Sequence, residues 1–102
     1  SVFKKGTIVS NKTIDTICDG LRAQIGTKTF PVIQDLVDEI ITIEENEVID
    51  SLRMIWERLK IIVEPSCSIA LALVLKKKHL FKGQNVGLIM SGGNVDLNKL
   101  PW

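Results

Sequence analysis

The spacing of apolar residues predicts one clear amphipathic helix, over residues 46–60. Apolar side chains recur there every three or four positions and so line one face of a helix, while the other positions are polar. Carboxylates lie around its start and cations at its end, which is the arrangement that the helix dipole favours. The apolar face consists of Val48, Leu52, Ile55 or Trp56, and Leu59.

Two further helices are predicted, one on each side of the first. The earlier helix starts near Thr29, a candidate cap, and has Pro31 in its first turn, where a missing N–H costs nothing. Its apolar residues at helical spacing are Val32, Ile33, Leu36 and Val37. The later helix follows Pro65 and is apolar on every side over residues 67–75. A helix without a polar face is normally buried all round, and one unit of this size can hardly enclose it.

Two segments are predicted to be strands. Residues 39–43 alternate and are rich in β-branched side chains, and residues 85–90 form a nearly continuous apolar run of strand length. Continuous apolar strands are typical of sheets that are covered on both faces. The order helix, strand, helix, helix, strand favours an α/β fold with parallel strands.

Composition narrows the classes of protein. The chain has 102 residues, enough for one domain, and its net charge of +1 gives no electrostatic indication of nucleic acid or membrane binding. No segment has the length of a membrane span or the pattern of a secretory signal, and the two cysteines, Cys18 and Cys67, fit neither a disulfide framework nor a zinc site. We therefore expect a cytoplasmic protein.

The apolar content is high for such a small chain. Apolar residues make up 45% of the sequence and the mean hydropathy is +0.21. Small domains have too much surface to hide that much apolar material. The chain is therefore expected either to oligomerise or to be part of something larger that covers its apolar faces.

Two features could carry chemistry. The tetrapeptide Ser91-Gly92-Gly93-Asn94 directly follows the predicted strand at residues 85–90, and ligands of open parallel sheets bind beyond the carboxyl ends of strands. It is either a ligand loop, in which Ser91 can donate or accept a hydrogen bond, or a plain glycine-rich turn. Glu64, at the predicted helix start, is either a capping carboxylate or a partly buried acid with a functional pKa. Without further context, a capping role for Glu64 and a plain turn at residues 91–94 are the simpler interpretations.

The remaining polar candidates have ordinary structural explanations. Arg58 and Lys60 suit a helix end, Asp19-Gly20 is typical of a turn, and His79 beside the lysine run 76–78 is expected at the surface. Trp56 on an apolar face is more often a core residue than a stacking platform.

Five segments, in order, resemble a known family. They are the segment Thr16-Ile17-Cys18-Asp19-Gly20, the helix of Phe30-Pro31-Val32-Ile33 with Asp38-Glu39, the run Trp56-Glu57-Arg58-Leu59-Lys60, Glu64-Pro65-Ser66, and Ser91-Gly92-Gly93-Asn94-Val95-Asp96. Together they are similar to serine racemases, serine/threonine dehydratases and 3-hydroxyaspartate dehydratases, which are fold-type-II pyridoxal-phosphate enzymes related to the tryptophan synthase β-subunit. The resemblance runs from about Thr13 to Trp102.

The resemblance implies roles for several residues. Ser91 would hydrogen-bond the pyridine nitrogen of the cofactor, Glu64 would lie near the pyridine edge, and Gly20 and Gly92 would line the ring. Arg58 and Lys60 match positions that help to hold a nucleotide effector in ATP-stimulated racemases. Cys18 and Cys67 stand where smaller residues are usual and could change the shape of the site; Cys67 is a buried small hydrophobe rather than a nucleophile.

The resemblance also implies missing parts. The family's Schiff-base lysine lies in a Ser-Phe-Lys-x-Arg-Gly motif, and no lysine of this chain has that context; Lys4 has only a superficial similarity. The loop that binds the substrate carboxylate, the glycine-rich phosphate loop and the acidic residues that bind a divalent cation such as magnesium would all lie upstream. No catalytic or metal-binding residue is therefore assigned here, and residues 1–102 are expected to be the C-terminal part of the large pyridoxal-phosphate-binding domain, without its N-terminal remainder.

Three functions follow as hypotheses. The first is a dehydratase (ammonia-lyase) that converts serine, threonine or 3-hydroxyaspartate to a keto acid and ammonia as part of a longer homodimeric protein. The second is a serine racemase, and the third is a non-catalytic remnant or assembly module. Under the enzyme hypotheses the partners are the hydroxy amino acid and the missing part of the enzyme, and this chain alone is not expected to be active.

Overall fold

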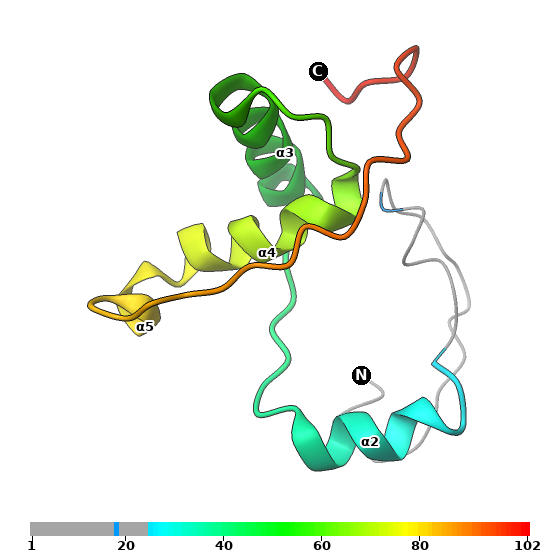
Figure 1. Ribbon diagram of the computed structural model, residues 1–102, viewed down its shortest axis with the longest axis vertical. Coiled ribbons are helices and arrows are strands. Elements are labelled where there is room, and N and C mark those ends of the chain that lie inside the picture. The colour runs from blue at the N-terminus through cyan, green and yellow to red at the C-terminus, as the bar shows by residue number, and fades with distance from the viewer. Residues whose placement is uncertain (1–17, 19–24) are drawn as a thin grey trace.

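The computed structural model describes residue 18 and residues 25–102, and the helices there follow the predicted order (Figure 1). Their bounds are α2 (Thr29–Leu36), α3 (Glu45–Leu59), α4 (Pro65–Lys76) and α5 (Lys78–Phe81). The first three match the predicted helices to within about two residues at each end. The short helix α5 was not predicted, because Lys76–78 and His79 were interpreted as a polar helix end.

Helices α3 and α4 pack against each other and form the core. Both helices, and the connector between them at residues 60–64, contribute buried apolar side chains, so that the amphipathic face predicted for α3 is the face that meets α4. The core consists of Leu52, Ile55, Val63 and Cys67, with Trp56 and Leu71 packed against it. Val48 is also buried. Leu59, predicted on the same face, is 56% exposed because the helix ends there, beyond its contact with α4.

Polar contacts join two points of α4, near its start and at its end, to the start of α3. The buried Ser68 hydroxyl on α4 lies 3.1 Å from the carbonyl oxygen of Val48 on α3 and 2.8 Å from that of Pro65. At the C-terminal end of α4, Lys76 Nζ lies 3.3 Å from Glu47 Oε1 and 3.4 Å from the carbonyl oxygen of Thr42. The first lysine of the 76–78 run is therefore paired rather than simply solvated.

The predicted difficulty of enclosing α4 is confirmed. Cys67, Ser68 and Ala72 are buried, but the other apolar residues over positions 69–75 are only half-buried. The helix begins at Pro65, as the sequence predicted. One side of an almost wholly apolar helix thus packs on α3, and its other sides have incomplete cover.

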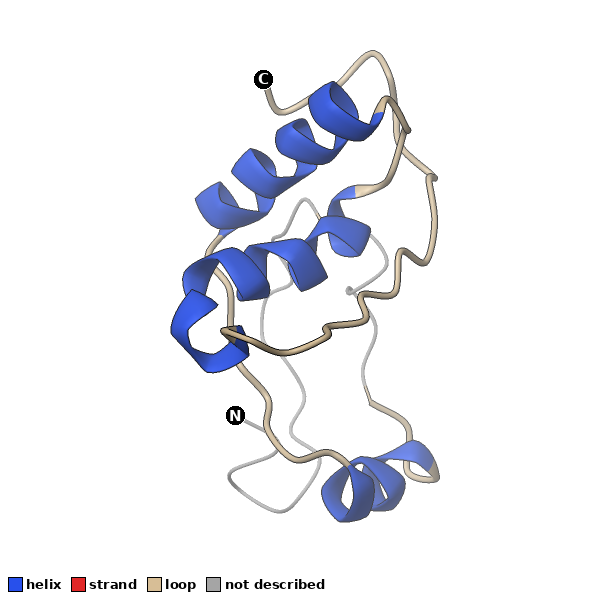
Figure 2. Cartoon of the chain, turned by 60° about the vertical axis from the view of Figure 1, so that its left-hand side comes forward, coloured by secondary structure: helices blue, strands red, loops and turns tan. Residues whose placement is uncertain are grey.

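Helix α2 lies apart from the α3–α4 pair (Figures 1 and 2). Phe30 is buried, whereas Val32 is 54% and Leu36 72% exposed. The predicted cap at Thr29 is wrong by one position: Lys28 is the N-cap, and the Thr29 hydroxyl donates to the carbonyl oxygen of Gly26 at 3.1 Å.

The two predicted strands are not strands in the described part of the chain. Residues 39–43 and 85–90 have no strand pairing, and residues 25–102 contain helices and loops only (Figure 2). A strand exists through hydrogen bonds to a neighbouring strand, and no such neighbour lies beside either segment in these residues. The parallel sheet is therefore not confirmed.

The chain after α5 returns along α4 to the N-terminal end of that helix (Figure 1). This return brings residues 91–94 beside the connector between α3 and α4. Among the described residues, no helix combines the length and the apolar character that a membrane crossing needs.

Candidate functional site

The Ser91–Asn94 turn and Glu64, far apart in the sequence, meet at the start of α4. The Glu64 N–H donates to the carbonyl oxygen of Gly92 at 3.0 Å. The return of the chain past α4 thus ends in a direct backbone contact between the two features that the sequence singled out. The structure brings both candidates into one site.

Glu64 occupies the N-cap position of α4, but its side chain makes no capping hydrogen bond. The interpretation of its carboxylate as a cap is therefore wrong. Pro65 in the first turn has no N–H to satisfy, and the Cys67 N–H donates to the backbone carbonyl of Glu64 at 3.0 Å, which leaves the carboxylate less to cap. The half-buried carboxylate instead turns towards the glycines of the turn.

Both glycines pack closely against the connector, and Gly93 is required there because a Cβ atom on it would meet backbone. A Cβ atom on Gly92 would overlap the Glu64 carboxylate, and a Cβ atom on Gly93 would lie 2.9 Å from the backbone carbonyl oxygen of Ile62. From the sequence, these glycines were expected to let a flat ligand approach the backbone. Their missing side chains face the connector at residues 60–64, so the absence of Cβ atoms is what lets the turn lie against it.

The Ser91 and Asn94 side chains, on either side of the glycines, are exposed. A serine hydroxyl can donate or accept one hydrogen bond, and an ionised carboxylate such as Glu64 can only accept. The exposed Ser91 hydroxyl and the half-buried Glu64 carboxylate are therefore each able to bind a polar group on the edge of a ligand.

The other predicted site residues lie elsewhere. Arg58 and Lys60 are exposed at the C-terminal end of α3, at the opposite end of the connector from Glu64. Lys60 adopts a left-handed conformation, with φ 59°, and its N–H donates to the Trp56 carbonyl. Gly20 lies outside the described residues. Cys67 is buried in the core, as expected of a small hydrophobe, and Cys18 is buried as well.

One contact near the site was missed by the sequence interpretation. Trp56 was expected to be a simple core residue, but its indole N–H donates to the backbone carbonyl of Val63 at 3.0 Å, directly before Glu64. Its ring also meets Trp102 edge to face, with centroids 5.2 Å apart and planes at 89°. The indole N–H, a donor that must find a partner when it is partly buried, was the signal that could have indicated this contact.

Comparison with solved structures identifies the fold. The chain superimposes on maize serine racemase with a TM-score of 0.86 and 39% identity, over 95% of this chain and 32% of the racemase. The described residues thus have the fold of the corresponding part of that protein.

Sequence comparison then identifies the family. The family described as pyridoxal-phosphate dependent enzyme matches residues 1–92, so the chain belongs to that family. It is 41% identical over 100 residues to a β-hydroxyaspartate dehydratase of Paracoccus denitrificans, covering 98% of this chain and 32% of that protein. It is 45% identical over 100 residues to a serine racemase of Arabidopsis thaliana, covering 93% of this chain and 30% of the racemase.

These comparisons confirm the predicted resemblance to serine racemases and hydroxy amino acid dehydratases. The chain spans about 30% of the length of the curated relatives that it matches.

The chemistry of the described residues fits one edge of pyridoxal phosphate. The cofactor is a flat pyridine ring with one ring nitrogen, and the exposed Ser91 hydroxyl can donate to or accept from such a nitrogen. The glycines add no side chain beside that hydroxyl, and the adjacent carboxylate of Glu64 adds an acceptor. The residues present therefore fit the ring edge of the cofactor.

Proposed function

We propose that this chain is the C-terminal part of the large domain of a pyridoxal-phosphate-dependent hydroxy amino acid dehydratase. The longer protein would convert serine, threonine or 3-hydroxyaspartate to a keto acid and ammonia. One observation carries the proposal. Glu64 and the 91–94 turn, which resemble parts of the family's cofactor site, are joined by a backbone hydrogen bond in a chain 41% identical to a β-hydroxyaspartate dehydratase.

Each residue of the site has a proposed task. When bound, pyridoxal phosphate supplies the electron sink for loss of the α-proton and the β-hydroxyl. Ser91 holds the pyridine nitrogen by a neutral hydroxyl, which leaves that nitrogen less firmly protonated than a carboxylate would. Gly20 and Gly92 line the ring. Glu64 lies at the pyridine edge, with its backbone fixed to Gly92.

The rest of the active site belongs to the longer protein in this proposal. It would supply the lysine that holds the cofactor, the loops that bind the phosphate and the substrate carboxylate, and the ligands of any divalent cation such as magnesium. We further propose a cytoplasmic homodimer, and a nucleotide effector near the exposed cations Arg58 and Lys60.

Serine racemase is the second candidate activity. Its support is the 45% identity to the Arabidopsis thaliana racemase and the structural likeness to the maize racemase. Both reactions begin with removal of the α-proton, so the described residues serve either. A non-catalytic assembly module is the alternative of another class, and it predicts no turnover at all.

Supplying the purified longer protein with L-serine, L-threonine and 3-hydroxyaspartate separates these candidates. A dehydratase releases a keto acid and ammonia, and a racemase produces D-serine from L-serine. Ser91→Ala removes the proposed contact to the ring nitrogen and is expected to lower turnover, whereas Thr27→Ala, which removes an exposed hydroxyl before α2, leaves it unchanged. Absence of all three products from the wild-type protein would favour the non-catalytic module.

A further inference from the structure

The connector at residues 60–64 leads from α3 to Glu64 at the start of α4, and a side chain of α3 holds it by a hydrogen bond. The Trp56 indole N–H donates to the carbonyl oxygen of Val63 at 3.0 Å. The Val63 side chain is 5% exposed and lies in the core with Leu52 and Ile55, which belong to α3 like Trp56. The residue next to Glu64 is thus fixed both by its side chain and by its carbonyl.

The opposite side of the connector meets the 91–94 turn. The Glu64 N–H donates to Gly92, and Gly93 packs so closely on Ile62 that a Cβ atom would lie 2.9 Å from the Ile62 carbonyl oxygen. Three successive residues of the connector, 62 to 64, are therefore held between α3 and the turn. A shift of the connector would move the Glu64 carboxylate relative to Ser91.

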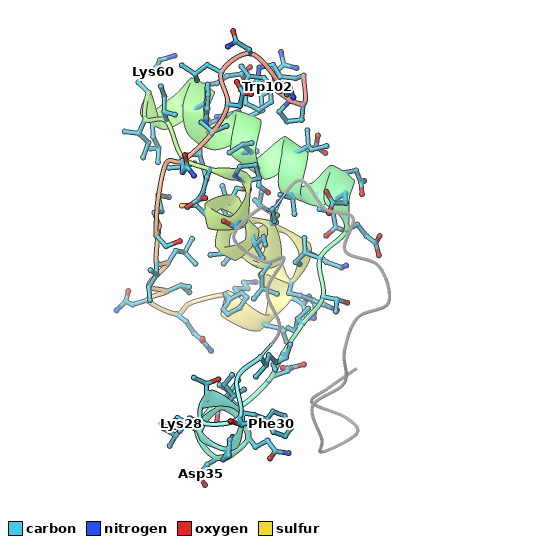
Figure 3. The ribbon with its side chains drawn as sticks, turned by 90° about the vertical axis from the view of Figure 1, so that its right-hand side faces the viewer. Lys28, Phe30, Asp35, Lys60 and Trp102 are labelled. Atoms are coloured by element: carbon cyan, nitrogen blue, oxygen red, sulfur yellow. The ribbon has the colours of Figure 1, made fainter. Side chains whose placement is uncertain are left out.

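Trp102 fixes the ring that makes the contact from α3. The chain after the turn doubles back, and Figure 3 shows Trp102 over α3 at the same end of the molecule as Lys60. Its ring meets Trp56 edge to face, a geometry that aromatic pairs prefer. This contact restricts the rotation of the Trp56 indole, whose N–H must point at Val63 to donate.

We propose that Trp56 is a positioning residue of the cofactor site. Its indole N–H holds the connector in the position in which the Glu64 carboxylate lies against Gly92, and Trp102 orients the indole. The proposal rests on the proposed function, because it takes Glu64 and Ser91 to be cofactor contacts. Hydrogen bonds weaken steeply when they bend, so this contact sets the backbone more precisely than apolar packing alone.

The competing explanation is that Trp56 only fills space beside the core. The Trp56→Phe variant distinguishes the positioning role from the space-filling role, because phenylalanine keeps an aromatic ring for the core and for Trp102 but has no N–H. A positioning role acts through Glu64, so the effect of Trp56→Phe should vanish once the carboxylate is removed. Two residues that act through one another give non-additive effects, whereas independent effects add.

The experiment uses the longer protein with four forms: wild type, Trp56→Phe, Glu64→Ala and the double variant. The affinity for pyridoxal phosphate is measured by titrating the apoenzyme, and the visible circular dichroism of the bound cofactor is recorded. We expect Trp56→Phe to weaken cofactor binding about threefold to tenfold, the range for one lost hydrogen bond, and to change the dichroism. In the Glu64→Ala background it should change neither. Leu59→Ala, an exposed change at the same helix end, is the control.

Each outcome either supports or overturns the positioning role of Trp56. Trp56→Phe without effect, or with the same effect in both backgrounds, overturns the positioning role. If Trp56→Phe fails to fold, Trp102→Ala is tested in both backgrounds, since it keeps the indole N–H and removes only the contact that orients it; the same criterion then applies. A wild-type protein that does not bind pyridoxal phosphate overturns the proposed function instead, so the two failures are distinguishable.

Discussion

Helices α2 and α3 have similar apolar patterns and different surroundings. The apolar face of α3 is buried against α4, whereas Val32 and Leu36 on α2 are 54% and 72% exposed. The partner of α3 follows it directly in the chain, after a five-residue connector. A helical pattern predicts that a face needs cover, but it does not say where the cover lies. The α3–α4 pair is specified locally, and α2 depends on something beyond its neighbours in the described residues.

The largest expected effect tests the core of the α3–α4 pair. Leu52 is fully buried, so Leu52→Ala in the longer protein should lower the free energy of unfolding by about 2–5 kcal/mol in urea denaturation. Leu36→Ala is the matched change on α2. If α2 stays uncovered in the longer protein, Leu36→Ala should change the free energy of unfolding by no more than about 0.5 kcal/mol. A loss of unfolding free energy for Leu36→Ala close to that for Leu52→Ala would show that the rest of the longer protein covers α2. The difference between the surroundings of α2 and α3 would then be limited to the residues of this chain.

The next effect tests how tightly the 91–94 turn is bound to the pair. Gly93→Ala places a Cβ atom 2.9 Å from a backbone oxygen, which cannot move as a side chain can. We expect a loss of about 1–3 kcal/mol in the same denaturation experiment. Gly87→Ala is the control, because nothing lies within 4 Å of its Cβ position. Equal stabilities of the two variants would mean that the turn is not held against Ile62.

A smaller effect tests the polar link inside the pair. Ser68→Ala removes the buried hydroxyl that bonds to Val48 across the helix interface. The expected loss is about 1 kcal/mol, the usual net contribution of one hydrogen bond. Ser66→Ala, at a half-buried position two residues earlier, serves as the comparison. A Ser68→Ala protein as stable as wild type would show that the Ser68 hydroxyl makes no net contribution to joining the helices.

The smallest effect concerns the ion pair between the C-terminal end of α4 and the start of α3. The Lys76 and Glu47 side chains are 34% and 29% exposed, so solvent weakens their attraction. Lys76→Met should cost less than about 1 kcal/mol, and the difference from wild type should shrink as salt is added, because ions screen exposed charges. A large, salt-independent loss would contradict this account and indicate that Lys76 matters through its bond to Thr42 instead.

The same contrast explains what the sequence could predict. Helices α3 and α4 were predictable because their periodicity and Pro65 are local signals. The strands at residues 39–43 and 85–90 were not confirmed, because pairing depends on neighbours that the local pattern does not contain. At the site, the sequence singled out Glu64 and the 91–94 turn, and it left open whether the Glu64 carboxylate caps α4 or is a partly buried acid. That choice is made by the close approach of Gly92, which brings together residues distant in the sequence.

The sequence could indicate that the Trp56 N–H needs an acceptor, but not that the acceptor is Val63, for a related reason. An apolar stripe identifies a tryptophan as a core residue, but only the path of the connector decides where its N–H points. The roles predicted for the site residues all stay predictions: Ser91, Glu64, Gly20, Gly92, Arg58 and Lys60.

The most direct test of the central claim is the binding of pyridoxal phosphate by the longer protein with Ser91→Ala. The wild-type protein should bind the cofactor with a visible absorption band, and Ser91→Ala should weaken binding about threefold to tenfold and change that band, while Thr27→Ala does neither. A Ser91→Ala protein that has wild-type affinity and an unchanged spectrum would contradict the claim that the 91–94 turn holds the edge of the cofactor.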